Sequence, residues 1–572
     1  MTLNGWLQIA IYFIVLILLV KPLGLYLSSV YQDQPTFLRP ILFPVEHFIY
    51  RLAGIRLEEE MPWSTYAITM LLFNGVGIFF LYLLQRTQGI LPLNPQNQGA
   101  VAPDLALNTA ISFVTNTNWQ NYSGESSLSY LTQMLGLTVQ NFLSAATGMA
   151  ILMAFIRGFK RHDTRLLGNF WVDLTRSVLY ILLPLSIGLA LVFVSQGVVQ
   201  TFSPSVTTHN HLSSPQTIAL GPVASQLAIA NLGTNGGGFF NTNAAHPFEN
   251  PNALTDFLLV LAQTVIPAAL TYTFGRMVGD TRQGWALLAV MLVFLFAFTG
   301  LAYASESAGN PRLAALGVDQ TASRTQPGGN MEGKEDRLGI ARSALFATTT
   351  TATSTGTVDS MHDSFTPLGG LVPMVMMLLG EVVLGGVGSG LYGMLVFVIV
   401  AVFVAGLMVG RTPEYLGKKI EIFEMKMAAL LILIMPLTVL GLTALAVVTA
   451  PGQSAVYNPG PHGFSEILYA FASQGNNNGS AFAGLVGNSA FYNFTGALAM
   501  LIGRFGLAIP TLALGGSLAA KKKVPAGAGT LSTTSPLFMG WLGGVILLVG
   551  ALNFVPALAL GPIIEQLIML GK

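Results

Sequence analysis

The 572-residue sequence contains no cysteine. This absence excludes disulfides, thiolate chemistry and cysteine-ligated metal sites, and it leaves the redox compartment open. Charged residues are also scarce, at 9% of the chain, whereas soluble domains carry about 25%. So few charges cannot cover a water-exposed surface, and 52% of the residues are hydrophobic. The composition therefore predicts a protein surrounded by membrane lipid, and the net charge of +1 gives no reason to expect a nucleic-acid partner.

Ten apolar runs are long enough to cross a bilayer as helices, which takes about 20 residues each. We therefore expect an all-α, multi-pass membrane protein with about ten transmembrane helices. The first run, residues 6–31, is too long for a signal peptide and lacks a preceding basic stretch, so it predicts a retained helix. The others are residues 61–84, 130–156, 170–195, 254–277, 285–305, 368–410, 422–448, 489–518 and 537–560, of which 368–410 is interrupted and counted once.

Lysine and arginine concentrate in alternate connections between these runs. The connections are residues 32–60, 157–169, 276–284, 411–421 and 519–536, and together with Lys426 they hold 16 of the 26 Lys and Arg residues. Because cytoplasmic loops are enriched in Lys and Arg, we expect these connections in the cytoplasm and both termini outside. Residues 311–342 also hold five basic residues, which neighbouring Asp and Glu partly offset. The inverted orientation is the alternative.

Four other connections share a pattern, a short apolar stretch followed by a run of Thr, Asn, Ser and Gly, at residues 104–120, 222–241, 337–359 and 462–484. Within them, Asn118, Gly236, Gly356 and Gly479 are separated by 118, 120 and 123 residues. Such even spacing indicates an internal repeat. We predict four helix–re-entrant pore loop–helix repeats around a pseudo-four-fold pore. Their limits are residues 61–157, 170–277, 284–411 (with a broken second helix) and 420–518, with extra helices at residues 1–31 and 536–572.

The polar core of each pattern contains no charged side chain. Non-helical backbone at membrane depth is tolerated where it lines a cavity, because other groups then satisfy its polar atoms. Four such segments around one axis present rings of carbonyl oxygens, which replace the water shell of a monovalent cation such as K⁺. Mg²⁺ and Ca²⁺ prefer carboxylates. The pattern therefore predicts K⁺ as the only metal ion, and the alternative is four ordinary extracellular loops rich in turn residues.

A glycine-rich piece, residues 385–390, interrupts the apolar stretch after the third pattern. Because each interior glycine costs a helix about 1 kcal/mol relative to alanine, we expect a break at Gly385, Gly386, Gly388 and Gly390. We interpret it as an intramembrane loop that gates or redirects the ion beneath the polar segments. A tight turn between two crossings, or a close contact between helices, is the alternative.

Three charged residues lie near this break or in the later helices. Glu381 precedes the break in an apolar segment, and an acidic residue in a membrane segment indicates a functional site and needs a partner. Arg411 closes the broken stretch, and Arg504 lies in the helix after the fourth pattern. We predict an ion pair of Glu381 with Arg504 or Arg411. In the alternative, both arginines reach the cytoplasmic face and Glu381 is only capped.

The remaining motifs give no convincing nucleotide-binding or metal-binding site. Residues 328–335 nearly match a phosphate-binding loop, but Glu335 stands where the Mg²⁺-binding Ser or Thr is required. No Asp-Lys-Thr-Gly phosphorylation motif occurs, and no large soluble region is present to hold ATP. We therefore expect no bound nucleotide and no ATP hydrolysis by this chain. His209 and His211 form an isolated His-x-His, which is typical of a solvated loop.

Residues 115–120, 234–241, 245–251, 361–365 and 476–484 together carry a specific resemblance that extends over essentially the whole chain. The sequence resembles the potassium-binding A subunit (KdpA) of the bacterial Kdp potassium-importing ATPase. The resemblance implies a subunit that selects K⁺ from the outside in a complex of the bacterial inner membrane. A P-type ATPase subunit and small accessory membrane subunits would be its partners, and the ion would pass through a tunnel to the ATPase subunit, which hydrolyses ATP.

The resemblance also implies roles for individual residues. The K⁺ filter would consist of Thr117, Asn118, Thr234, Asn235, Gly236, Gly237, Thr355, Gly356, Thr357, Asn478, Gly479 and Ser480, with Gln120 close by. The gate or tunnel mouth would contain Glu381, Gly385, Gly386, Gly388, Gly390, Arg411 and Arg504. The first repeat has Asn118 where the others have glycine, so its carbonyl geometry is the least defined and the ring can be asymmetric.

Two other functions fit parts of the sequence. A stand-alone K⁺/Na⁺ transporter or channel of the same four-repeat architecture would work down an ion gradient. A membrane scaffold or a secondary carrier for an organic solute is the other alternative, but carriers centre their binding site on a two-fold repeat. An adjacent P-type ATPase gene would favour the ATPase subunit over both.

Overall fold

The computed structural model describes residues 1–208, 215–525 and 530–572, so His209 and His211 lie outside the described residues. Within these ranges, ten helices are long and apolar enough to cross a membrane, which confirms the expected number. The β structure is minor. It comprises two short antiparallel hairpins, β1 (Val206–Thr208) with β2 (Gln216–Ile218) and β3 (Glu414–Tyr415) with β4 (Lys418–Lys419), in which Val206 pairs with Ile218 and Glu414 with Lys419.

Each predicted repeat contains two long helical segments with a shorter helix between them. The first has α3 (Trp63–Thr87), α4 (Pro103–Val114) and α6 (Val139–Lys160), the last preceded by a π-helical segment, Thr132–Thr138. The second has α7 (Phe170–Arg176), a π-helical segment (Ser177–Leu182), α8 (Leu183–Ser195), α9 (Val223–Leu232) and α10 (Ala253–Val278). The third has α11 (Thr281–Ser307), α13 (Gly339–Ala352), α14 (Pro367–Leu378) and α15 (Ser389–Met408). The fourth has α16 (Ile422–Val448), α18 (Pro461–Gly475) and α19 (Ala490–Ala520). The residue limits of the repeats stay a prediction.

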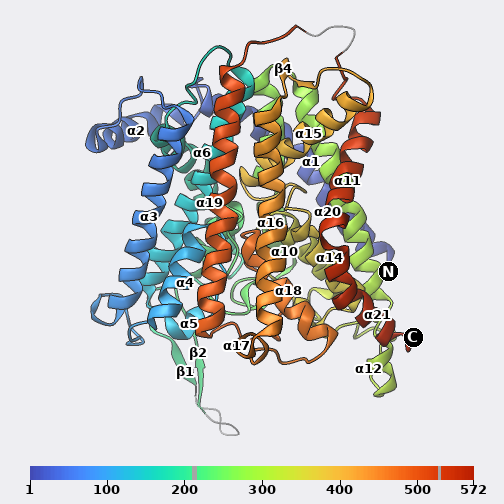
Figure 1. Cartoon of the computed structure of the whole chain (residues 1–572). Coiled ribbons are helices and arrows are strands. Elements are labelled where there is room, and N and C mark those ends of the chain that lie inside the picture. Colours follow the sequence, from blue (N-terminus) through green and yellow to red (C-terminus); the bar gives the residue numbers. More distant parts are fainter. Residues whose placement is uncertain (209–214, 526–529) are drawn as a thin grey trace.

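The extra helices are α1 (Leu3–Tyr31), which packs along α10, and α20 (Pro536–Leu558), which continues through a π-helical segment (Ala559–Ile563) into α21 (Ile564–Met569). Short helices are α2 (Arg39–Ala53), α5 (Gly124–Ser127), α12 (Pro311–Ala315) and α17 (Ala450–Gln453). Single 3₁₀ turns are Gln88–Ile90, Asn243–Ala245 and His362–Ser364. α2, which no apolar run in the sequence predicted, lies across the bundle rather than along it (Figure 1).

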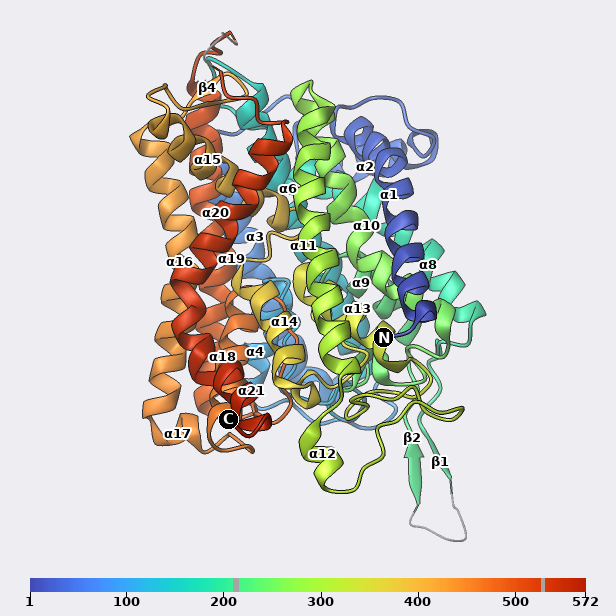
Figure 2. The ribbon, with the colours of Figure 1, turned by 90° about the vertical axis from the view of Figure 1, so that its right-hand side faces the viewer.

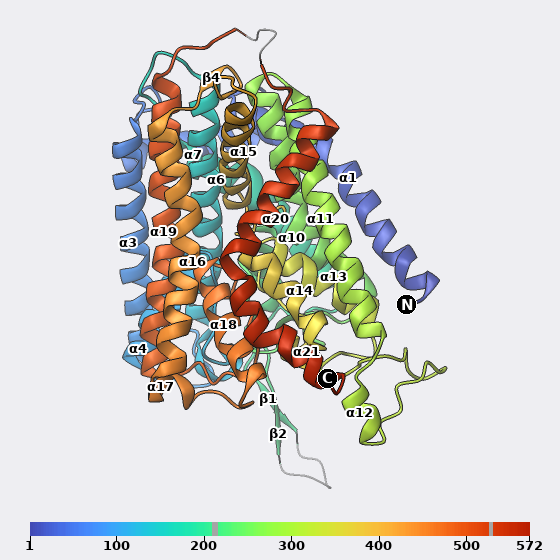
Figure 3. The same cartoon turned by 45° about the vertical axis from the view of Figure 1, so that its right-hand side comes forward.

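The long helices form a bundle (Figures 1 and 3), whose centre is buried and whose exterior exposes many large apolar side chains. α6 and α10 are mostly buried, whereas α3, α16 and α20 expose large apolar side chains such as Leu72, Leu437 and Leu552. Extensive exposed apolar surface is unfavourable in water and marks a membrane or interaction surface. The outward faces of these helices therefore suit contact with lipid tails.

The five basic connections meet at one end of the bundle, as the charge pattern predicts. Arg161 pairs with Glu60 at 2.6 Å, and Lys418 Nζ donates to the carbonyls of both Arg161 and Lys521. Tyr415 Oη donates to Gln283 Oε1 at 3.3 Å, which adds the connection after α10. Both termini lie toward the other end of the bundle (Figure 1). Which end faces the cytoplasm stays a prediction.

At the end that carries the termini, a buried ion pair ties the loop after α11 to the bundle. Lys334 Nζ lies 2.6 Å from Glu306 Oε2, and neither side chain is exposed. Glu306 also accepts hydrogen bonds from Asn330 Nδ2 (2.8 Å) and from the backbone N–H of Thr366 (2.8 Å). Burial lowers the pKa of Lys334, and the Glu306 carboxylate opposes this shift. The pair thereby joins α11, the loop and the start of α14.

We expect Lys334→Met to destabilise the chain by about 3–5 kcal/mol, because it leaves the Glu306 carboxylate buried without its cation. Thermal unfolding of the purified chain measures the effect. Arg324→Met is the control, since Arg324 is exposed in the same loop and should change the stability by less than about 0.5 kcal/mol. Equal unfolding temperatures for the two variants would contradict a stabilising role of the pair.

Candidate ion-binding filter

The four short helices α4, α9, α13 and α18 lead into segments with the same backbone pattern. In each segment, two residues with positive φ are separated by one residue, and the second segment has a third such residue at Gly237 (67°). The pairs are Asn116 and Asn118 (66° and 51°), Thr234 and Gly236 (48° and 77°), Ser354 and Gly356 (57° and 84°), and Asn477 and Gly479 (57° and 106°). Thr234 is β-branched, for which this conformation is strained and needs support from its surroundings. The repeat predicted from sequence spacing is thus present in the backbone angles.

The four segments close into a ring in the order of the sequence. Each glycine of the ring lies directly against a carbonyl of the next segment. A Cβ atom would collide with that carbonyl oxygen at Gly236 (against Thr355), Gly356 (against Asn478) and Gly479 (against Thr117). The first segment has Asn118 at this position, and its Nδ2 donates to the carbonyl of Gly236 at 2.8 Å. The ring is therefore complete, and its asymmetry lies at Asn118, as the sequence suggests.

Side-chain hydrogen bonds join every neighbouring pair of segments. They run from Asn116 Nδ2 to the Thr234 carbonyl (2.9 Å), from Thr357 Oγ1 to the Gly237 carbonyl (3.2 Å), from Ser354 Oγ to the Asn476 carbonyl (2.9 Å) and from Asn477 Nδ2 to Thr117 Oγ1 (2.9 Å). Because these donors are uncharged, the ring stays neutral. Buried polar networks of this kind fix one geometry when their members are satisfied.

The structure brings the predicted filter residues together. Thr117, Asn118, Thr234, Asn235, Gly236, Gly237, Thr355, Gly356, Thr357, Asn478 and Ser480 are buried in the four segments, and Gly479 lies among them. Gln120 braces the neighbouring segment, since its Nε2 donates to the carbonyl of Gly238 (2.9 Å) and its Oε1 accepts from the Gly238 N–H (3.1 Å). A polar but uncharged ring of carbonyls can replace part of the water shell of a weakly hydrated cation.

The glycine-rich break lies against the same ring, midway along the bundle between α14 and α15 (Figure 2). The Gly385 N–H donates to the carbonyl of Ala352 at the end of α13 (3.0 Å), and the Val387 N–H donates to Thr234 Oγ1 (2.9 Å). A Cβ atom on Gly388 would collide with the carbonyl of Gly148 in α6. α14 has only 12 residues and is too short to cross a bilayer. The break therefore does not join two full-length crossings, while its place within one crossing and its gating role stay predictions.

The predicted ion pairs of Glu381 do not form between these described residues. The Glu381 carboxylate accepts a hydrogen bond from Asn478 Nδ2 at 3.1 Å, while Arg504 Nη2 donates to the carbonyl of Ser144 at 2.6 Å. Arg411 follows the far end of α15, whose 20 residues separate it from the glycine loop by about 30 Å. Glu381 and Arg504 are thus both buried next to the ring, but each uses a neutral partner. Apolar periodicity gave no means to predict these partners.

Three residues of the ring were absent from the predicted set, namely Asn116, Ser354 and Asn477. Each has positive φ two residues before the aligned Asn118, Gly356 or Gly479. The available signal was residue type, because asparagine adopts left-handed backbone more readily than most residues and occupies two of these positions. At the fourth position, Thr234 was included in the prediction.

The sequence matches the family described as potassium-transporting ATPase A subunit (KdpA) over residues 10–567. The chain belongs to the KdpA family. Among its relatives, the potassium-binding subunits of the potassium-transporting ATPases of Sorangium cellulosum and Herpetosiphon aurantiacus are 62% and 61% identical. These alignments cover 100% of both chains for the first and 99% of both for the second. Full-length matches at this identity leave no part of the chain outside the family.

The KdpA-family chain also resembles a solved structure, the potassium transporter TrkH from Vibrio parahaemolyticus. The TM-score is 0.50 over 90% of this chain and 98% of that one, at 14% sequence identity. At this identity the likeness bears on the fold alone. It agrees with an all-α membrane protein built from helix–pore loop–helix repeats.

Proposed function

We propose that this KdpA-family chain captures K⁺ through its filter and passes it to a P-type ATPase partner for ATP-driven import. The observation that carries this function is the closed ring of neutral carbonyls from four re-entrant segments, each fixed by two left-handed residues. The names of the relatives support both the ion and the ATPase complex. In this proposal the chain binds no nucleotide itself, and small accessory membrane subunits and lipid surround it.

In the proposed filter, K⁺ is bound by the residues at which the segments meet. These are Thr117, Asn118, Thr234, Asn235, Gly236, Gly237, Thr355, Gly356, Thr357, Asn478, Gly479 and Ser480, with Gln120 at the rim. The proposed gate below them contains Glu381, Gly385, Gly386, Gly388, Gly390 and Arg504. Arg411 would lie only at the far end of the proposed ion path, away from the filter, because the length of α15 separates it from the glycine loop.

The decisive experiment is copurification with the ATPase partner and measurement of its ATP hydrolysis against K⁺, Rb⁺ and Na⁺. Hydrolysis that rises with K⁺, and at higher concentrations with Rb⁺, supports the proposal. Hydrolysis that is independent of all three ions would refute it.

A stand-alone K⁺ or Na⁺ transporter is the second candidate, because a neutral ring of carbonyls would select an alkali cation in either kind of protein. The chain alone, reconstituted in vesicles with a K⁺ gradient, separates the two candidates. Passive K⁺ flux without ATPase subunits supports the stand-alone transporter. No passive K⁺ flux through the chain alone, together with ATP-dependent K⁺ uptake by the complex, supports the ATPase subunit.

We expect Asn118→Ala to lower the apparent K⁺ affinity about tenfold. The change removes the bond that closes the ring at the Gly236 carbonyl together with a bond to Asn141 Oδ1, and each hydrogen bond contributes roughly 0.5–1.5 kcal/mol. K⁺-stimulated ATP hydrolysis measures the affinity. The control is Asn94→Ala, because in the described residues the Asn94 side chain bonds only to backbone groups of Gln88 and Gln98, in the loop after α3. Equal affinities of the two variants would count against Asn118 as a member of the filter.

We further propose that the chain resides in the bacterial inner membrane with the five basic connections in the cytoplasm and both termini outside. The absence of cysteine makes single-cysteine labelling clean. In intact cells with a permeable outer membrane, a membrane-impermeant maleimide should label Arg324→Cys and leave Lys522→Cys unlabelled until the cells are lysed. The reverse pattern would establish the inverted orientation.

A further inference from the structure

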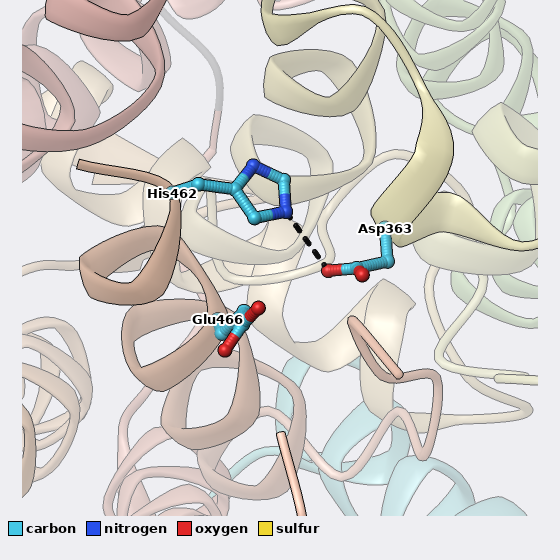
Figure 4. A group of neighbouring side chains, drawn as sticks. All are labelled: Asp363, His462 and Glu466. Atoms are coloured by element: carbon cyan, nitrogen blue, oxygen red, sulfur yellow. Dashed lines mark hydrogen bonds and ion pairs between the residues drawn. The ribbon is translucent and has the colours of Figure 1, made fainter. Parts of the chain in front are cut away.

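Away from the filter, three potential metal ligands converge where α18 begins. His462 and Glu466 lie four residues apart on α18 and therefore on one face of the helix. Asp363 reaches them from the 3₁₀ turn His362–Ser364, with its Oδ1 3.1 Å from His462 Nε2 (Figure 4). One ligand atom from each residue lies within 4.8 Å of the other two. An imidazole with two carboxylates is a donor set that divalent transition-metal ions accept.

Glu466 supplies an independent sign that a cation belongs here. Its side chain has no exposed surface. Oε1 accepts a hydrogen bond from Asn458 Nδ2 at 2.8 Å, whereas Oε2 has no hydrogen-bond partner among the described residues. A buried carboxylate oxygen without a partner is costly, because burial removes its water and nothing replaces it. A metal ion held with Asp363 and His462 would satisfy it.

A second carboxylate fixes the orientation of the imidazole. Glu565, on the C-terminal helix α21, places Oε1 2.7 Å from His462 Nδ1. Histidines that bind metals in proteins commonly donate their other ring N–H to a carboxylate, which sets the tautomer and leaves the metal-binding nitrogen free. With Nδ1–H donated to Glu565, Nε2 faces Asp363 on the side where the ligand atoms gather, and its lone pair would become available to a metal ion that displaces the Nε2 proton.

The charges around the cluster leave room for a divalent ion. Asp363, Glu466 and Glu565 bring three negative charges, and His462 brings at most one positive charge. Arg312 and Glu332, which line the adjoining pocket, offset each other. Two net negative charges at a half-buried place are unfavourable without a counter-ion. A divalent cation that displaces the proton of His462 would reduce this excess.

We propose that Asp363, His462 and Glu466 bind one divalent transition-metal ion of the Zn²⁺ type, with Glu565 as a positioning residue for His462. The ion would fasten the start of α18 to the turn after the third filter segment and, through Glu565, to the C-terminal helix. Since α18 runs directly into the fourth filter segment, a metal ion at the start of α18 would restrict the movement of that segment.

The test is titration of the full chain with ZnCl₂ by calorimetry in detergent, after treatment with a chelator. All proteins carry His209→Ala and His211→Ala, because the isolated His-x-His offers two further imidazoles. We expect one Zn²⁺ per chain, with binding weakened at least 100-fold in His462→Ala and Glu466→Gln. Glu565→Gln should weaken it about 10- to 100-fold, as expected for a carboxylate that only positions the ligand. Glu335→Gln, which removes a carboxylate that pairs with Arg337 outside the cluster, should leave Zn²⁺ binding unchanged, and Mg²⁺ should not compete.

Two results would overturn the proposal. One is the absence of Zn²⁺ binding in the parent chain, which carries only His209→Ala and His211→Ala. Equal Zn²⁺ binding in this parent chain and in its His462→Ala variant would count in the same way. The other is an X-ray absorption spectrum of the Zn²⁺-loaded parent chain without an imidazole ligand, a measurement that needs no folded variant. If His462→Ala lowers only the unfolding temperature and the parent binds no Zn²⁺, then the cluster is a hydrogen-bonded contact and no metal site.

Discussion

Alanine in place of Gly236 or Gly479 is expected to lower the apparent K⁺ affinity of ATP hydrolysis about 100-fold, which corresponds to about 2.7 kcal/mol. Both glycines have positive φ, where an L side chain is strained by about 1–3 kcal/mol. Both also face a carbonyl of the next segment, so the added methyl group must displace an oxygen of the ring. The strain and the displacement act at the same place. Titration of ATPase activity with K⁺ measures the effect.

Discrimination between K⁺ and Rb⁺ should fall in the same variants, because it depends on the positions of the same oxygens. Gly236→Asp and Gly479→Asp should lower the affinity and the selectivity over Rb⁺ and Na⁺ further, since they bring a carboxylate into a neutral ring. Gly75→Ala is the matched control, because no atom lies within 4 Å of an added Cβ atom there. If the K⁺ dependence of all four filter variants equalled that of Gly75→Ala, these glycines would not belong to the ion site.

The sequence predicted the parts of this ring that depend on spacing and residue type. The intervals between Asn118, Gly236, Gly356 and Gly479 reveal the repeat because equivalent positions need the same backbone angle. The number of crossings also followed from apolar runs, since lipid contact leaves few charges on a helix. The glycine loop was predicted because several glycines in succession weaken a helix whatever surrounds them.

The contacts between the repeats could not be predicted in this way. The bond from Asn118 to the Gly236 carbonyl joins residues 118 positions apart, and no local pattern encodes it. The predicted ion pair of Glu381 with Arg504 was wrong for the same reason. Their opposite charges suggested a pair, but in the fold Glu381 accepts a bond from an amide and Arg504 donates to a carbonyl. The proposed metal site likewise brings together Asp363, His462 and the positioning residue Glu565 from three separate elements, which no local pattern connects.

Glu381→Gln is expected to reduce the K⁺ transported per ATP on the order of tenfold while leaving the preference for K⁺ over Rb⁺ within about twofold. Gln retains the shape of the side chain and an oxygen that accepts the bond from Asn478 Nδ2, so the fourth filter segment keeps its support. Gln cannot carry the negative charge, however, that the buried Glu381 carboxylate would offer, just before the glycine loop, to a cation that leaves the carbonyls. Losing this charge raises the energy of the ion below the filter without moving the filter oxygens.

Uptake of K⁺ and ATP hydrolysis, measured together in vesicles that contain the complex, test this separation. Asp319→Asn removes an exposed carboxylate at the end of the bundle that carries the termini and should change neither quantity. Glu381→Asp keeps the charge and should restore part of the transport, because the charge and not the length of the side chain is what the ion requires. An unaltered ratio of transport to ATP in Glu381→Gln would show that the carboxylate only supports Asn478, and a loss of K⁺ selectivity would place it in the filter instead of in the gate.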